Sequence, residues 1–254
     1  MLKNLYNLYY PTAVSYLSTY ILHSENMCGR YSVNPKAKGL SRAVKLLQKA
    51  EAEAHYNAAP SQGLPVITDE KPDEVQFFQW GLLPHWASGP DYHPKSINAR
   101  AETLSEKNTF KQLLKRHRCL VPADGFYEWK KVGKTKIPYR ILLKNEDLFS
   151  FAGLWDEWAD KETGEVRHTF TIITTSANEL VKPLHDRMPV LLHPEEEKLW
   201  LQEATDADHL KLLHPYPSEE MKLYQVSQLV NSPTHDSPEV VAPDTTTGTQ
   251  GSLF

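Results

Sequence analysis

Apolar residues occur mainly in short runs along residues 28–230, and most of these runs end at Gly, Pro, Asp or Lys. Short apolar runs of this kind, closed by turn residues, predict β-strands. We expect strands at residues 29–33, 64–68, 74–80, 118–121, 126–131, 138–143, 148–154, 169–175, 188–192 and 226–230.

Helical spacing of apolar residues is confined to fewer segments. It predicts helices at residues 40–54, 101–114 and 194–202, the last with a proline in its first turn, and a short helix that begins at Ser176. Strands outnumber helices and do not alternate with them regularly. The pattern predicts an α+β fold, a single domain with a curled, mostly antiparallel sheet.

The two ends of the chain differ in composition from this middle part. Residues 1–27 hold one lysine, no continuous apolar core and no small-residue cleavage site, which argues against a secretory signal. We interpret them as a removable leader or as a misassigned upstream extension before a true start at Met27. From residue 231 the chain is rich in Ser, Pro, Thr, Asp and Gly, which predicts a disordered acidic tail over 231–254. The domain is then expected at 28–230.

Charge and cysteine usage narrow the function classes. The net charge is −4, and three acidic residues without Lys or Arg lie after residue 230, so the middle of the chain is close to neutral. Binding to nucleic acid would therefore depend on a local arginine cluster. Two widely spaced cysteines argue against a disulfide scaffold or a zinc site and fit the cytoplasm. No run approaches the roughly 18 apolar residues of a membrane span.

The dipeptide Met27-Cys28 has a chemical meaning if Met27 is a start residue. Removal of Met27 would leave Cys28 with a thiol and a free α-amine on adjacent carbons. The unperturbed pKa is about 8 for the amine and about 8.5 for the thiol. Such a pair captures an aldehyde as a Schiff base, and sulfur attack on the same carbon then closes a thiazolidine ring. The alternative is that Cys28 is an ordinary small buried residue.

Three further polar clusters interrupt apolar surroundings. They lie at residues 96–103 around Asn98, at 121–129 around Glu128, and at 184–189 around His185. Taken singly, Asn98 fits a turn former, Glu128 a solvent-facing strand residue and His185 a loop histidine. If Glu128 instead lies in a pocket, burial would raise its pKa toward a value useful for acid–base chemistry.

Five motifs occur in an order typical of one family. They are Met27-Cys28-Gly29-Arg30, the run from Trp80 to Pro84, the run from Asn98 to Thr103, the run from Arg118 to Trp129, and the run from His185 to Pro189. Over residues 27–230 the chain closely resembles the SOS response-associated peptidases, abasic-site sensors that crosslink to single-stranded DNA. The resemblance implies a sheet curled into a pseudo-barrel, with a positively charged groove for DNA.

The resemblance also implies roles for individual residues. Cys28 would form the crosslink, Asn98 would position its amine, Glu128 would act as acid and base, and His185 would be the catalytic histidine. Contacts to DNA are expected from Arg30, Arg100, Arg187, Trp80, Pro60 and Thr174. No cofactor or metal is expected, and the protein should act as a monomer.

The expected function is therefore DNA repair: covalent trapping of abasic sites in single-stranded DNA through a thiazolidine at Cys28. Autoproteolytic removal of Met27 and a weak lyase activity would accompany it. Two alternatives stay open. One is a thiol amidase or peptidase that acts on other substrates, and the other is a binding module for single-stranded DNA without catalysis.

Three smaller expectations concern the end of the chain, the second cysteine and the tryptophans. Gln250 to Phe254 resemble the short peptides by which bacterial proteins bind the replicative sliding clamp. Cys119 lies in an apolar strand and is expected to be inert. Trp155, Trp158 and Trp200 are expected to pack in the core or at its rim.

Overall fold

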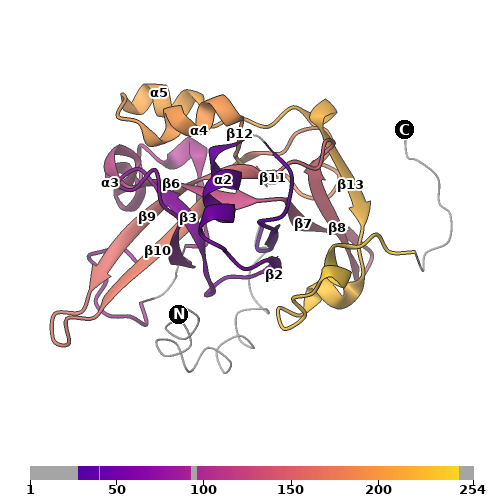
Figure 1. Cartoon of the computed structure of the whole chain (residues 1–254), viewed down its shortest axis with the longest axis horizontal. Coiled ribbons are helices and arrows are strands. Elements are labelled where there is room, and N and C mark those ends of the chain that lie inside the picture. The colour runs from indigo at the N-terminus through magenta and orange to yellow at the C-terminus, as the bar shows by residue number, and fades with distance from the viewer. Residues whose placement is uncertain (1–27, 40, 93–95, 246–254) are drawn as a thin grey trace.

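The computed structural model describes residues 28–39, 41–92 and 96–245. Short strands dominate it (Figure 1). The strands are β1 (Tyr31–Val33), β2 (His55–Ala58), β3 (Gly63–Thr68), β4 (Gln76–Trp80), β5 (Asn98–Arg100), β6 (Arg118–Ala123), β7 (Gly125–Val132), β8 (Thr135–Leu143), β9 (Phe149–Ala159), β10 (Val166–Ser176), β11 (Arg187–Pro189), β12 (Leu191–Leu192) and β13 (Met221–Gln225).

Helices are shorter and fewer within the same residues. The α-helices are α2 (Arg42–Lys49), α3 (Asn108–Arg116), α4 (Pro194–Leu201) and α5 (Asp206–Lys211). The 3₁₀ turns are η1 (Ala101–Thr103), η2 (Ser218–Glu220), η3 (Gln228–Asn231) and η4 (Pro238–Val241).

Five strands form a closed ring because β10 pairs on one side with β4 and on the other with β9. The circuit continues from β4 through β3 and β6 back to β9. All of these pairs are antiparallel except β10 with β4, which is parallel. This ring is the pseudo-barrel, and the predicted α+β class is confirmed.

A second sheet, in the order β13-β8-β7-β1-β2, lies beside the ring (Figure 1). Aromatic side chains join the two sheets: Tyr31 of β1 contacts Trp80 of β4 and Phe151 of β9, with ring centroids 5.2 and 5.8 Å apart. All three side chains are almost fully buried. The core therefore runs between the sheets, and β1 and β7 lie directly on it.

The helices α3, α4 and α5 gather at one end of the ring, at the upper left of Figure 1. Trp200 of α4 is fully buried and donates its indole N–H to the carbonyl of Cys119 in β6, 3.0 Å away. The guanidinium of Arg118 is also buried there and donates to the carbonyls of Trp200 and Leu114. Trp155 and Trp158 are buried too, so the predicted packing role of the tryptophans is confirmed.

Most predicted elements lie within a few residues of the observed ones, but three predictions were wrong. The segment 101–114 divides into η1 and α3 rather than forming one helix. Residues 176–184 contain turns rather than the expected short helix. At 226–230 the chain forms η3 instead of a strand, because the Ser227 hydroxyl accepts the backbone N–H of Leu229 and bends the chain.

The predicted disordered tail is also wrong for residues 231–245. This segment packs along β2, β7 and β8, at the lower right of Figure 1. Val240 is fully buried in a small apolar cluster with Tyr127, Val226 and Val230. One apolar anchor and many backbone hydrogen bonds hold a segment whose composition is mostly polar. Residues 246–254, with the predicted clamp-binding peptide, lie outside the described residues, as do residues 1–27.

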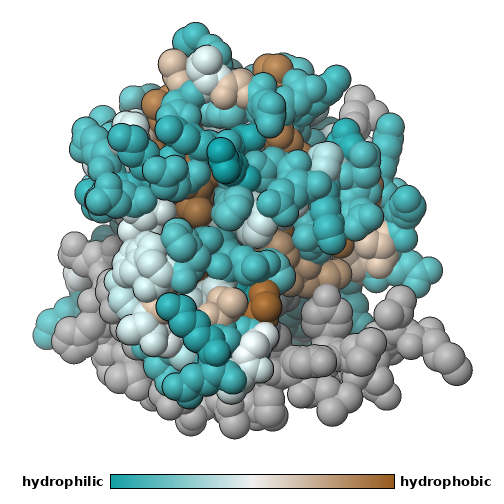
Figure 2. Space-filling model, turned by 90° about the vertical axis from the view of Figure 1, so that its left-hand side faces the viewer, coloured by the Kyte–Doolittle hydropathy of each residue, from teal (hydrophilic) through white to brown (hydrophobic). Residues whose placement is uncertain are grey.

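The surface of the described part is mainly hydrophilic. Figure 2 shows this on the side of the β9–β10 hairpin, where hydrophobic side chains appear only in small separate patches. No helix within the described residues has the length and hydropathy needed to cross a membrane.

Candidate active site

A buried contact joins two residues that lie 100 positions apart. The backbone nitrogen of Cys28 donates to Oε1 of Glu128 at 2.7 Å. Cys28 is 4% exposed and Glu128 is 3% exposed. The nitrogen that would become the α-amine is thus already bound to a carboxylate within the core.

Alternation along β7 explains how a glutamate comes to lie inside. Successive side chains of a strand point to opposite faces. Tyr127 and Trp129 pack into the apolar cluster formed with Val226, Val230 and Val240, so Glu128 lies on the other face of β7, where it binds the Cys28 nitrogen. The backbone N–H of Tyr127 also donates to the carbonyl of Arg30, which ties β7 to the chain just after Cys28.

Burial changes the acidity of both groups. It raises the pKa of Glu128, although hydrogen bonds from Cys28 and the charge of His185 act in the opposite direction. Burial, with the charge and hydrogen bond of Glu128, also raises the pKa of the Cys28 thiol well above its ordinary value. The thiol is therefore protonated at neutral pH, and Glu128 is suited to accept and return protons.

His185 lies in the turn before β11. Its Nδ1 accepts the backbone N–H of Arg187 at 3.0 Å and lies 2.9 Å from a carboxylate oxygen of Asp186. Because Nδ1 accepts this N–H, the hydrogen of the ring lies on Nε2. Nε2 is therefore the ring atom suited to donate a proton.

Strand β10 brings two further candidates together. Asn98 begins β5, which pairs in parallel with β10 at Ile172, and Arg187 begins β11, which pairs with β10 at Ser176. Asn98 and Arg187 therefore lie on opposite edges of β10, at positions four residues apart along it. The positive charge of Arg187 acts on the Cys28 thiol, which links this part of β10 to the buried contact.

Arg187 is not an open phosphate contact in this structure. Its two terminal nitrogens donate to the two carboxylate oxygens of Glu102, at 2.6 and 2.9 Å, and one also donates to the carbonyl of Thr174 at 2.7 Å. The hydrogen bond from Arg187 lowers the pKa of Glu102, so that pair is charged at neutral pH. Arg100, in contrast, is exposed.

The other predicted DNA contacts divide into buried and accessible residues. Trp80 is 1% exposed and donates its indole N–H to the carbonyl of Ile97, and Thr174 is fully buried. Both side chains lie inside the fold in this structure, and their contact with DNA stays a prediction. Pro60 is half-buried in the turn after β2. Arg30 is half-buried and is hydrogen-bonded to other parts of the chain.

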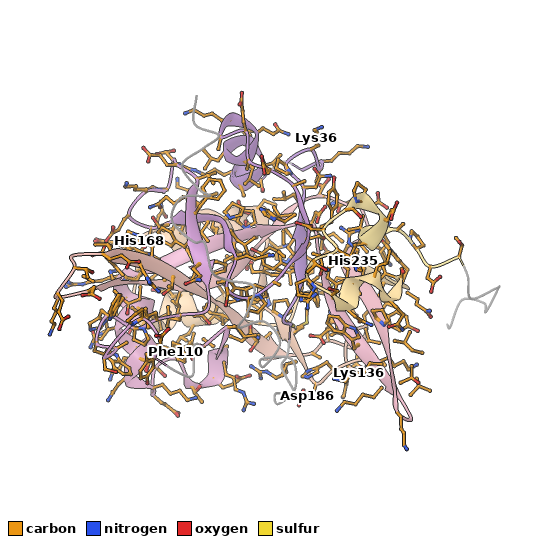
Figure 3. The ribbon with its side chains drawn as sticks, turned by 90° about the horizontal axis from the view of Figure 1, so that it is seen from below. Lys36, Phe110, Lys136, His168, Asp186 and His235 are labelled. Atoms are coloured by element: carbon orange, nitrogen blue, oxygen red, sulfur yellow. The ribbon has the colours of Figure 1, made fainter. Side chains whose placement is uncertain are left out.

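Two accessible features were not predicted from the sequence. Trp86, six residues after Trp80, is 52% exposed and makes an edge contact with Tyr92. The β7–β8 hairpin carries four lysines, and no Asp or Glu occurs between Glu128 and Glu146. Figure 3 shows Lys136 of this hairpin and Asp186, next to His185, on the same lower side of the molecule. The signal for the hairpin was the basic run over residues 130–136.

No group of three or more His, Cys, Asp or Glu side chains suited to hold a metal occurs within the described ranges.

Comparison with known proteins identifies the family. The family model for SOS response associated peptidase (SRAP) matches residues 27–233. The chain belongs to the SRAP family. Among SRAP relatives, the abasic site processing protein YoqW of Bacillus subtilis (strain 168) is 47% identical over 222 residues, which is 85% of this chain and 99% of that protein.

More distant SRAP relatives extend the similarity. The abasic site processing protein HMCES of Xenopus tropicalis is 32% identical over 220 residues, 74% of this chain and 65% of that protein. A crystal structure of a protein from Bacteroides thetaiotaomicron superposes with a TM-score of 0.74 at 33% identity, and the match covers 85% of this chain and all of that one. The family model, the relatives and the fold thus agree.

Proposed function

We propose that this protein processes abasic sites by forming a covalent bond to them in single-stranded DNA, through Cys28 as the N-terminal residue. The observation that carries the proposal is the 2.7 Å contact between the Cys28 nitrogen and buried Glu128. An abasic sugar offers an aldehyde when its ring opens, and the relatives are named for processing that lesion.

The first step is imine formation at the sugar C1. The neutral α-amine of Cys28 attacks the aldehyde carbon, and Glu128 takes the proton that the nitrogen loses. Water then leaves the carbinolamine with a proton returned by Glu128. Nε2 of His185 donates a proton to the ring oxygen when the sugar opens.

The second step closes the ring. The sulfur of Cys28 adds to the imine carbon, and the thiol proton moves to the nitrogen through Glu128. Aldehyde and aminothiol thus become a thiazolidine and one water. Because the thiol pKa is raised, the sulfur enters as a thiol beside its base rather than as a free thiolate. This argues against a thiol amidase, whose nucleophile needs a lowered pKa.

Both steps need the Met27–Cys28 bond to be hydrolysed, which consumes one water and releases methionine from a chain that begins at Met27, or residues 1–27 from the full chain. Cys28 has a φ of 39°, in the left-handed region that disfavours residues with a Cβ. Such a conformation costs on the order of 1 kcal/mol while a preceding carbonyl is present. Cleavage of the Met27–Cys28 bond would release this strain, and Glu128 is the nearby carboxylate that would activate the water.

DNA would be held by charge and by stacking. Exposed Arg100 and the lysines of the β7–β8 hairpin supply positive charge, and exposed Trp86 replaces Trp80 as the aromatic candidate for a base. Binding of this type weakens with salt and has little sequence preference.

The test is adduct formation with a single-stranded oligonucleotide that contains one abasic site. The protein that begins at Met27 should give a denaturation-resistant adduct whose mass equals that of residues 28–254 plus the oligonucleotide, less one water. Cys28→Ala should give none, whereas Cys119→Ala, the matched change at the second cysteine, should leave the adduct intact. An adduct that survives Cys28→Ala, or that forms with N-acetylated Cys28, contradicts the proposal.

A clamp interaction is a separate proposal that rests on Gln250 to Phe254 alone. A Leu-Phe pair and a glutamine fit a short peptide that inserts into an apolar groove. A peptide of residues 240–254 should bind a bacterial sliding clamp, and replacement of Leu253 and Phe254 by alanine should abolish binding. Equal binding by both peptides would exclude it.

A further inference from the structure

Asn57 is the centre of a hydrogen-bond network that the proposed chemistry does not use. Asn57 lies within β2, and its side chain is fully buried. Its Nδ2 donates to the carbonyls of Val230, Ser232 and His235, at 3.2, 2.9 and 2.9 Å. We call residues 226–244 the C-terminal strap, since Asn57 binds this segment along its length.

The strap begins and ends on the second sheet. Val226 donates its backbone N–H to the carbonyl of Pro138 in β8, and Asp244 donates its own to Gln225. Between these points Asp236 accepts the backbone N–H of Asn57 at 2.9 Å and pairs with His55 at 3.3 Å. The strap is thus fastened to β2 and β8 at the same time.

Arg30 completes the same network. Its Nη1 donates to Oδ1 of Asn57 at 3.0 Å and to the carbonyl of Val230 at 2.8 Å, and its Nη2 lies 3.5 Å from the carbonyl of Asn231. Burial lowers the pKa of Arg30 to about 10, so the group remains charged at neutral pH. The guanidinium is turned toward the strap.

The strap also holds the other side of the site. Trp129 donates its indole N–H to Oδ1 of Asn231 at 2.8 Å. Tyr127 packs with Val230 and Val240, and its hydroxyl donates to the carbonyl of Tyr56 at 2.6 Å. These two residues flank Glu128 on the opposite face of β7.

One segment therefore binds the residue two positions after Cys28 and both neighbours of Glu128. We propose that the strap, through Asn57, sets the distance between the Cys28 amine and the Glu128 carboxylate, and that Arg30 is a positioning residue rather than a phosphate contact. The proposal rests on the proposed function and adds an element that the reaction needs.

The two roles of Arg30 predict different kinetics for single-turnover adduct formation. A positioning residue affects the maximal rate at saturating DNA, since a displacement of about 1 Å can cost up to about 100-fold. A phosphate contact affects the DNA concentration at half-saturation and the salt dependence of binding. Lysine separates them, because it keeps the charge but cannot bridge Asn57 and Val230 as a planar guanidinium does.

The experiment uses Arg30→Lys, Arg30→Gln, Asn57→Ala and the milder Trp129→Phe, each in the chain that begins at Met27 and in the full 254-residue chain. We expect Arg30→Lys and Arg30→Gln to lower the maximal rate about 10-fold or more, with half-saturation and salt slope unchanged. Asn57→Ala should match them, and the double variant Arg30→Gln with Asn57→Ala should be no slower than either single one.

Lys45 is exposed on α2, and Lys45→Gln is the control for the loss of one positive charge. Thermal unfolding shows whether each variant is folded. If Asn57→Ala does not fold, Trp129→Phe, which loses the N–H to Asn231 and has a smaller ring on the apolar cluster, must still slow the reaction. A normal rate for Arg30→Lys, with raised half-saturation for Arg30→Gln, would overturn the inference. Absence of any adduct from the wild-type protein would instead remove the proposed function.

Discussion

At the scale of single residues, Glu128 has two opposing effects. Its carboxylate is placed to move protons for Cys28, yet burial raises its pKa and so makes its charged form unfavourable in the folded protein. A carboxyl group with a raised folded-state pKa binds more protons folded than unfolded. Its contribution to stability therefore falls as pH rises from the unfolded value of about 4.3 through the folded pKa.

Glu128→Gln separates these effects. Glutamine keeps an oxygen for the Cys28 nitrogen but cannot exchange protons, so adduct formation should slow at least about 100-fold. The variant should also melt at a higher temperature than wild type at pH 7, and this difference should disappear below about pH 4. Thermal unfolding of both proteins from pH 3.5 to 8 measures this difference in melting temperature. A variant that is less stable at pH 7 would show that the carboxylate, once buried, is well compensated.

Trp86 and Trp80 give a second comparison between residues of one type. Trp86→Ala should weaken binding to undamaged single-stranded DNA by about 1–3 kcal/mol, the usual value of one base stacked on an aromatic ring, with little change in stability. Trp80→Phe removes the indole hydrogen bond to Ile97 and puts a smaller ring in the core, and should lower stability and leave DNA affinity unchanged. Fluorescence anisotropy and urea unfolding of both variants give the comparison. If Trp80→Phe weakened DNA binding and Trp86→Ala did not, Trp80 rather than Trp86 would contact DNA.

At the scale of elements, the β7–β8 hairpin links the site to the surface. Lys131 and Lys136 stand directly opposite each other in its register, an arrangement of like charges that destabilises a strand pair. Lys134 lies in the turn between them, next to Gly133, whose φ of +60° fits the tight turn. An anion such as a DNA phosphate would relieve the repulsion.

A hairpin variant tests whether these lysines bind DNA. Replacing Lys131, Lys134 and Lys136 by glutamine should raise the stability of the free protein slightly and weaken DNA binding. The slope of log K against log salt should fall by about 0.7 for each phosphate that the variant no longer neutralises. Exposed Lys111, Lys115 and Lys198, on α3 and α4, are the matched set of three for the control variant. If both variants change the slope equally, net charge alone and not the hairpin lysines determines the salt dependence of DNA binding.

At the scale of the whole molecule, the strap shows that the folded unit extends past residue 230. Val240 is fully buried, so Val240→Ala should cost about 1–2 kcal/mol of unfolding free energy in urea, the usual cost of removing two buried methyl groups and leaving a small cavity. Val241→Ala, beside it but only partly buried, is the control and should cost less. An unchanged unfolding free energy in Val240→Ala would mean that the segment beyond 230 adds nothing to the fold.

Local patterns predicted much of this molecule, and interactions between residues distant in sequence account for the rest. The alternation of Tyr127, Glu128 and Trp129 along the strand allowed Glu128 to lie in water or in a pocket. Tyr127 and Trp129 pack on an apolar cluster, and Glu128 is buried on the other face. Arg30 was assigned to DNA because the family resemblance implies a phosphate contact at this position. Its partners come from residues 57 and 230, and no local period reveals them.

The strap was missed for a related reason. Its residues resemble a solvated tail, and one buried valine does not change the composition of such a segment. Trp80 was placed near DNA by its motif, although the motif cannot distinguish a structural tryptophan from one that binds a base. The exposed Trp86 lay a few residues further along the chain.

The separation of Cys28 from its partners also has a consequence for biosynthesis. Cys28 leaves the ribosome early, Glu128 follows 100 residues later, and Asn231 and Asp236 come only near the end of the chain. At about 5–20 residues per second, the nascent chain spends about 5–20 s with Cys28 made and Glu128 absent, and about 10–40 s before the strap is made. Cys28, Glu128 and the strap thus first come together when translation is nearly complete, so a prematurely terminated chain carries the cysteine without the residues that the proposed chemistry needs.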